Sequence, residues 1–473
     1  MKGKGFLRFG LGLGVAAVLA VFAGNPGAAF AEETVPVRFE VQPDTPVVES
    51  GSGRRVIVRA LVRSDGGVKS RRAPLAVALV LDKSGSMASD RKMENAKLGA
   101  MEALRMLLPS DAVTVVAYDD EARVLFPGRE VGRGAEDARL SRSIRRLQPG
   151  GSTALYDGVL TGAEELRPFV EEGFLPRILL LSDGIANVGP SSAEELARLG
   201  RKLAREEMTI TTIGLGLDYN EDLMTALAAA SGGNAYFARH AEMLPDIFAR
   251  DMQDAVTVTA RKVRFRLRCA DGVRPLGILG REGTRDAVSM ETVIDNLYAT
   301  GEKYALFELE LPRGEAGTVL DAATVELEYV DAATGASRRM TLPVKVTFTK
   351  DAKEVAANRD RNILAQAELA KNAEVREEAI RLVDEGRTGD AANLLKKRKG
   401  ALSALLPSVG SAAPMMEKEA GFFEELAENI LSMGSLSSYE RKQVMNEAYV
   451  QKNQQAPLNL SDDVSGDVSP DLH

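Results

Sequence analysis

The stretch LAVALVLDKSGS, residues 75–86, joins an apolar run to a polar loop. Its first seven residues are apolar, which is typical of a strand that is buried on both faces of a sheet. The carboxylate of Asp82 ends the run, and two serines, Ser84 and Ser86, follow it. A buried strand that leads into such side chains predicts a parallel sheet with a functional loop at its carboxyl edge.

Further apolar runs alternate with amphipathic helical patterns after this stretch. The apolar runs cover residues 112–118, 177–181 and 208–213, and the helical patterns cover residues 91–108, 154–172, 192–207, 220–231 and 241–254. This alternation predicts an α/β fold over residues 74–255, a doubly wound and mostly parallel sheet with helices on both faces.

The segments on either side of the α/β region show the alternating pattern of half-buried strands. Residues 34–73 hold two such runs, in which Arg55, Arg59 and Arg63 are expected to form a solvated face. Residues 257–350 hold several more, separated by Gly and Asp turns, which favours an antiparallel β-sandwich. We expect the first segment to join this sandwich, so that the α/β domain is an insertion in it.

Helical patterns fill residues 352–450. One long helix is expected over residues 352–385, and further helices over residues 390–406, 417–432 and 438–450. The last segment, residues 451–473, is polar and acidic and is expected to be a disordered tail.

Residues 1–31 have the features of an export signal peptide. Lys2, Lys4 and Arg8 form a basic start, an apolar segment follows, and residues 29–31 (Ala-Phe-Ala) match a cleavage site. An uncleaved membrane anchor is the alternative. Cleavage predicts an exported protein, periplasmic or secreted, with no membrane span left in the mature chain.

The charge and the composition exclude several classes of function. The net charge is −8, and −11 without the export segment, which argues against nucleic acid as a partner because phosphates require basic contacts. A single cysteine excludes an intramolecular disulfide, and with only two histidines a His/Cys zinc site is nearly excluded.

Three polar segments lie at strand and helix ends of the α/β region. They are Asp82-x-Ser84-x-Ser86, the Gly-Gly-Ser-Thr sequence that ends at Thr153, and the Ser-Asp-Gly sequence around Asp183. Taken alone, each is a common loop, cap or turn sequence. Together they bring two carboxylates and three hydroxyls to one sheet edge, and such hard oxygen donors suit Mg²⁺. Asp119 and Asp120, after another strand, are candidates for the rim of this site.

These segments resemble the metal-ion-dependent adhesion site of the von Willebrand factor type A domain family, whose pattern is Asp-x-Ser-x-Ser, then Thr, then Asp. All five positions match, and the resemblance covers about residues 74–255. It implies that Ser84, Ser86 and Thr153 coordinate the metal directly, and that the two aspartates act directly or through water. It also implies a protein partner with an exposed Asp or Glu, whose carboxylate completes the coordination of Mg²⁺, with Mn²⁺ or Ca²⁺ as alternatives.

Three functions remain compatible with the sequence. The first is a non-enzymatic, metal-dependent module for protein binding or cell adhesion outside the cytoplasm. The second is a metal-dependent hydrolase, which is less favoured because neither a histidine nor a second acidic cluster accompanies the motifs. The third is a scaffold whose helical region binds the partner, in which case a change at Ser84 weakens folding but not partner capture.

Overall fold

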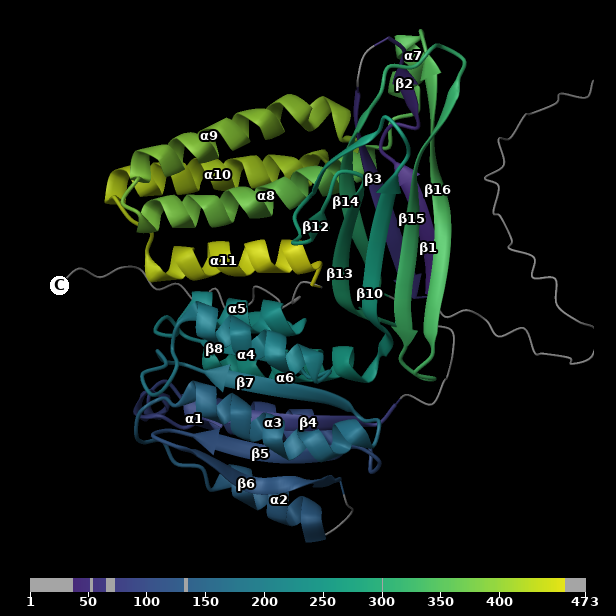
Figure 1. Cartoon of the computed structure of the whole chain (residues 1–473). Helices are drawn as coiled ribbons and strands as arrows, with labels where there is room; N and C mark the ends of the chain where they lie inside the picture. Colours follow the sequence, from purple (N-terminus) through teal and green to yellow (C-terminus); the bar gives the residue numbers. More distant parts are fainter. Residues whose placement is uncertain (1–36, 52–53, 65–72, 132–134, 300, 456–473) are drawn as a thin grey trace, which may run out of the picture. The chain divides into compact units, whose positions relative to one another are not determined.

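The computed structural model describes residues 37–51, 54–64, 73–131, 135–299 and 301–455 (Figure 1). The predicted signal peptide and the residues after Gln455 lie outside these ranges. Within the ranges, no helix combines the length and the apolar character that a membrane span requires.

The α/β region is a six-stranded sheet in the order β6-β5-β4-β7-β8-β9 (Figure 1). Neighbouring strands are parallel, except that β6 runs antiparallel to β5 at one edge. The strands are β4 Leu75–Asp82, β5 Ala112–Tyr118, β6 Ala122–Glu130, β7 Leu175–Ser182, β8 Thr209–Leu215 and β9 Ala235–Ala238. The helices are α1 Lys92–Arg105, α2 Ala135–Arg145, α3 Leu155–Glu171, α4 Ala193–Arg205, α5 Glu221–Ser231 and α6 Leu244–Val256.

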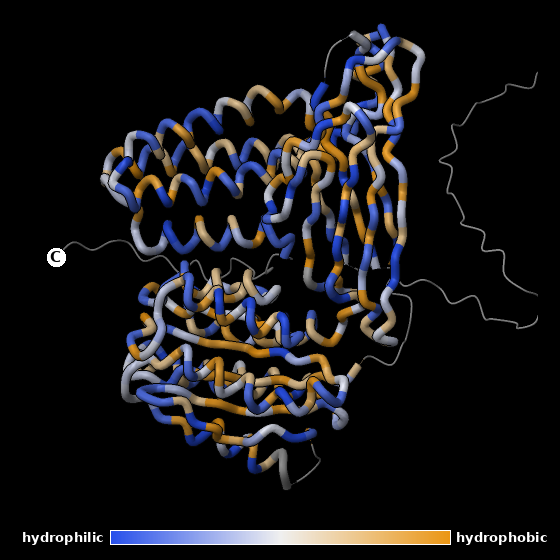
Figure 2. Tube along the Cα trace, in the orientation of Figure 1, coloured by the Kyte–Doolittle hydropathy of each residue, from blue (hydrophilic) through white to orange (hydrophobic). Residues whose placement is uncertain are grey.

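The central strand β4 explains why helices cover both faces of this sheet. Every residue of β4 is buried, and the apolar strands are visible in Figure 2 as orange segments. Leu79 packs in a cluster with side chains of α1, α2 and α6, whereas Val80 packs in a cluster with α3, α4 and α5. The predicted α/β fold is therefore confirmed. Strand β6 and helix α2 were not predicted; β6 is a largely exposed edge strand that contains Pro127, which is atypical of a strand interior.

The two β segments form a sandwich of two sheets, ordered β1-β3-β14-β11 and β12-β13-β10-β15-β16-β2. Strand β3 pairs with β14 along its length, so strands from both sides of the α/β region share one sheet. The strands are β1 Val37–Pro43, β2 Val47–Glu49, β3 Arg54–Ser64, β10 Val258–Cys269, β11 Arg274–Ile278, β12 Thr284–Arg285, β13 Ser289–Tyr298, β14 Glu302–Leu311, β15 Val319–Asp331 and β16 Ser337–Thr349.

The prediction that the arginines of the early strands form a solvated face is wrong for Arg59. This arginine is 8% exposed, and its guanidinium donates hydrogen bonds to Gln42 at 2.7 Å and Gln366 at 3.2 Å. The cause is a helix that the strand pattern does not show: Ile57 of β3 packs against Ile363 of α8, which spans Arg361–Asp384. The other two arginines of the run are exposed, as expected.

The remaining helices are α7 Ala352–Ala357, α8 Arg361–Asp384, α9 Thr388–Leu405, α10 Ala413–Met433 and α11 Ser438–Asn453. The single helix expected over residues 352–385 is wrong, because Asp360 caps a new helix by accepting hydrogen bonds from the backbone of Asn362 and Ile363. The expected disorder is also wrong for residues 451–455. Helix α11 extends into this segment, and the side chain of Gln455 is buried.

Helix α11 is fixed to the α/β domain by polar contacts. Lys442 is 4% exposed, and its Nζ donates a hydrogen bond to the backbone oxygen of Tyr219 at 2.8 Å and pairs with the carboxylate of Glu221. The hydroxyl of Tyr449 donates to the backbone oxygen of Gly233 at 2.7 Å. These contacts fasten the C-terminal helix to α5 and to the loops on either side of it.

We expect Lys442→Met to lower the free energy of unfolding by about 2 kcal/mol, because a buried, charged hydrogen-bond donor is lost. The matched control is Lys399→Met, since the Lys399–Glu424 pair is solvent-exposed and such pairs contribute less than about 1 kcal/mol. Urea unfolding followed by circular dichroism measures both variants. Equal losses in the two variants would contradict a stabilising role for the Lys442 contacts.

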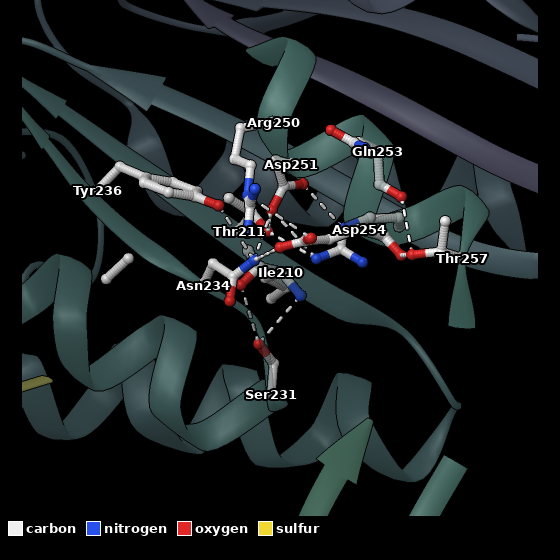
Figure 3. A network of polar contacts seen from close by, with 12 residues as sticks. Ile210, Thr211, Ser231, Asn234, Tyr236, Arg250, Asp251, Gln253, Asp254 and Thr257 are labelled. Atoms are coloured by element: carbon white, nitrogen blue, oxygen red, sulfur yellow. Dashed lines mark hydrogen bonds and ion pairs between the residues drawn. The ribbon is translucent and has the colours of Figure 1, made fainter. Parts of the chain in front are cut away.

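A buried polar network lies at the amino ends of β7, β8 and β9 (Figure 3). The carboxylate of Asp251, on α6, accepts hydrogen bonds from Arg177 Nε at 2.9 Å, from Thr211 Oγ1 at 2.8 Å and from Asn234 Nδ2 at 2.9 Å. Burial raises the pKa of the neighbouring Asp254, and the negative charge of Asp251 adds to this rise. The network ties α6 to three strands at the sheet edge opposite the polar loops.

Candidate metal centre

The two aspartates of the predicted site leave neighbouring strands at the same edge. Asp82 is the last residue of β4, and Asp183 directly follows β7. Leu81 is in register with Leu181, so Asp183 lies one residue beyond the position beside Asp82. Both side chains are fully buried. The parallel pairing of two apolar strands is thus what brings these charges together.

The serine hydroxyls connect the two strand ends. Ser84 Oγ and Ser86 Oγ lie 3.0 Å apart, and Ser86 Oγ donates a hydrogen bond to Asp183 Oδ1 at 2.6 Å. Ser84 is buried, whereas Ser86 is exposed. The oxygen cluster therefore opens to solvent on the side of Ser86.

Thr153 reaches the same cluster from the start of α3. A Cβ on Gly184 would lie 3.5 Å from Ser86 Oγ and 3.6 Å from Thr153 Oγ1, so both hydroxyls border the same small space. The backbone nitrogen of Thr153 donates to Asn187 Oδ1 at 2.8 Å, which fixes the residue. Glycine at position 184 leaves this space free. The structure thus brings together all five residues that the sequence predicts.

The carboxylate of Asp82 is held by the protein on both of its oxygens. Oδ1 accepts the backbone N–H of Ser84 at 2.8 Å, and Oδ2 accepts the hydroxyls of Ser182 at 2.9 Å and Tyr118 at 3.3 Å. Burial raises its pKa to about 6, and the negative charge of Asp183 contributes to the rise. A cation at this position would counter both effects, because it favours the ionised carboxylate.

One of the two glycines before Thr153 is required by the backbone conformation of that segment. Gly151 has a φ of +83°, and a Cβ there would approach Asp119 Cβ to 2.9 Å and Asp120 Oδ2 to 3.0 Å. Asp120 Oδ1 accepts the backbone N–H of Ser152 at 2.9 Å, and Asp119 forms an ion pair with Lys83. Asp120 therefore holds the loop that carries Thr153, whereas the side chain of Asp119 holds Lys83 of the first polar segment.

Lys92 is a member of the cluster that sequence reasoning missed. Its Nζ lies 2.8 Å from Asp183 Oδ2, and the two side chains are 9% and 0% exposed. Lys92 starts helix α1 and belongs to none of the three polar segments, so no motif marks it. It neutralises the carboxylate that a metal ion would also require.

The residues present fit a small divalent cation. Two carboxylates with three hydroxyls form a hard-oxygen donor set, and Mg²⁺ takes few carboxylates while it keeps several waters. Among the described residues, no cluster of three or more His, Cys, Asp or Glu side chains is placed to hold a metal. The hydroxyls are therefore needed to complete any site here.

We expect Lys92→Met to tighten Mg²⁺ binding by at least about tenfold, because a positive charge beside the cation is removed while the side-chain volume is kept. The same variant should melt at a lower temperature in EDTA, since Asp183 loses its buried partner. Calorimetry and thermal melting measure these effects. Arg91→Met is the control, because Arg91 pairs with Glu94 in solvent. An unchanged Mg²⁺ affinity in Lys92→Met is the result that contradicts this role.

The chain has recognisable relatives. Residues 76–250 match the family model of the von Willebrand factor type A domain. The chain is 26% identical over 301 residues to an uncharacterised protein from Synechocystis sp., a match that covers 62% of this chain and 70% of that protein. It is 29% identical over 168 residues to human inter-alpha-trypsin inhibitor heavy chain H4, a match that covers 34% of this chain and 18% of that protein.

A solved structure shares most of the architecture. The protein described as von Willebrand factor type A from Catenulispora acidiphila aligns with a TM-score of 0.66 and 17% sequence identity, covering 89% of this chain and 98% of that one. At this identity the likeness concerns the fold alone. It extends the match beyond residues 76–250, to the flanking segments of the chain.

Proposed function

We propose that this chain is a non-enzymatic binding protein whose contact with a protein partner depends on a divalent cation. The basis is the match of residues 76–250 to the von Willebrand factor type A domain, a kind of domain that binds protein partners. The observation that carries the metal dependence is the convergence of Asp82, Ser84, Ser86, Thr153 and Asp183 on one solvent-facing cluster.

A bound Mg²⁺ supplies an electrophilic centre with an incomplete protein ligand set. Asp82 is fixed by three hydrogen bonds and contributes charge, and the hydroxyls contribute neutral oxygens. Ser86 lies on the exposed side, where a carboxylate from a partner can approach. The partner proposed here is a protein with an exposed Asp or Glu, met outside the cytoplasm as the export segment predicts.

Affinity capture tests this function. The full chain without the export segment is immobilised and exposed to extracellular and envelope proteins in Mg²⁺, and bound protein is released by EDTA. We expect a protein that is retained by the wild type and released by EDTA, and that Asp82→Asn does not retain. Retention that is independent of both Mg²⁺ and Asp82 contradicts the proposal and indicates binding by the helical region.

A further inference from the structure

Helix α2, which lies beside the edge strand β6, carries a group of exposed arginines on its outer face (Figure 1). The group, called the α2 arginines below, consists of Arg139, Arg142, Arg145 and Arg146. The opposite face of the helix, with Leu140 and Ile144, is buried in the core cluster shared with α1. Within the part of the chain that the structure describes, no ion pair joins an α2 arginine to an acidic residue. The surface of α2 is therefore strongly positive.

The sequence around the α2 arginines holds no acidic residue to balance them. Residues 138–153 contain four arginines and neither Asp nor Glu, although acidic residues outnumber basic ones in the whole chain, 68 to 60. On helix α4, by contrast, Arg198 pairs with Glu194 one turn away. Basic side chains in the last turn of a helix complement its dipole, but Arg139 lies before that turn. The dipole therefore does not account for the whole group.

The α2 arginines lie close to the candidate metal centre. Arg146 is four residues before Gly150, whose backbone N–H donates a hydrogen bond to the backbone oxygen of Lys83 at 2.7 Å. Lys83 belongs to the loop that carries Ser84 and Ser86. Four residues span at most about 14 Å, so the backbone of Arg146 is within that reach of the serine loop. A peptide with one carboxylate on the cation can therefore place its next side chains, about four to six residues further on, beside the α2 arginines.

The two sides of the metal centre differ in charge. On the side of β8 and β9, acids and bases alternate around a pocket that is lined by Asp90, Arg91, Lys92, Asp218, Arg239 and Glu242. On the side of β5 and β6, the two rim acids are engaged, because Asp119 pairs with Lys83 and Asp120 accepts the backbone N–H of Ser152. The α2 arginines lie beyond them on this side. An acidic ligand is therefore favoured across β5 and β6 and not across β8 and β9.

We propose that the partner presents an acidic segment, in which one carboxylate completes the coordination of the cation and later ones contact the α2 arginines. The inference rests on the proposed metal-dependent function. It narrows the partner from any protein with an exposed Asp or Glu to one with a run of about five or more residues rich in them. Arginine suits this contact, because its planar guanidinium donates two parallel hydrogen bonds to one carboxylate.

The test measures the fluorescence anisotropy of a labelled peptide of ten glutamates with the chain without its export segment. We expect binding in Mg²⁺ that is lost in EDTA, and that R139Q/R142Q/R145Q/R146Q weakens at least about tenfold, because four attractive charges are removed. R139K/R142K/R145K/R146K keeps the charges and should restore most of the affinity.

The matched control is R198Q/R201Q/K202Q/R205Q, which removes four exposed positive charges from α4. Helix α4 follows β7 and leads into β8, so its last turns lie at the edge opposite the metal centre. We expect this variant to bind the peptide within about twofold of the wild type, because distant charges in solvent are screened.

The contrary results separate this inference from the proposed function. Equal weakening by the α2 and α4 variants, or peptide binding that is as tight in EDTA as in Mg²⁺, would overturn the inference. Calorimetric binding of Mg²⁺ without any binding of the peptide would overturn it while the metal site stands, and failure of every form to bind Mg²⁺ would overturn both. Binding to phosphatidylglycerol vesicles that requires the α2 arginines, without binding of the peptide, would overturn it in favour of a membrane surface.

Discussion

Titration of Mg²⁺ into the metal-stripped chain is expected to show one saturable site, which Asp82→Asn weakens by about 100-fold. Asparagine keeps the shape of the side chain and can still accept the backbone N–H of Ser84. It removes the negative charge at the end of β4, however, and with it the main electrostatic attraction for the cation. The loss of Mg²⁺ affinity therefore measures the effect of the charge and not a change in local folding.

The matched control for this titration is Asp218→Asn. Asp218 lies at the same edge of the sheet, in the loop after β8, and it is exposed and outside the cluster. We expect its Mg²⁺ affinity to stay within about twofold of the wild type, because charges in solvent are strongly screened. Equal weakening by both variants, or Mg²⁺ binding that Asp82→Asn leaves intact, would show that the cation sits elsewhere.

The second large effect is expected in the buried network at the opposite edge. We expect Asp251→Ala to lower the free energy of unfolding by about 3–5 kcal/mol, because the guanidinium of Arg177 is left buried without its partner carboxylate. Arg177 and Asp251 are 5% and 0% exposed and are joined by two hydrogen bonds, of 2.9 and 3.1 Å. Urea unfolding followed by circular dichroism measures the loss.

Two further variants serve as controls for this stability prediction. Glu194→Ala removes the solvent-exposed partner of Arg198 and is expected to cost less than about 1 kcal/mol. The double variant Arg177→Met/Asp251→Leu removes both charges and is expected to be more stable than Asp251→Ala, because no buried charge remains unpaired. A double variant as unstable as the single one would place the loss in packing, not in charge.

Sequence patterns were sufficient where a local rule decides the outcome. The apolar run before Asp82 could only be a strand buried on both faces, and its alternation with helical patterns fixed the parallel sheet. Because parallel strands end at the same edge, the order of the three polar segments was enough to predict that their oxygens meet. The hydrogen bond from Ser86 to Asp183 is a consequence of that geometry.

Tertiary structure decided whatever depends on a neighbour that is distant in the chain. Arg59 is buried because α8 covers its strand, and residues 451–455 are ordered because they contact the sandwich and β9. Lys92 joins the metal cluster only because α1 starts beside the end of β7. The spacing of apolar residues, with a period of two in strands and 3.6 in helices, predicts which face of an element is buried. It does not predict which other element packs on that face, because that depends on contacts between residues distant in the chain.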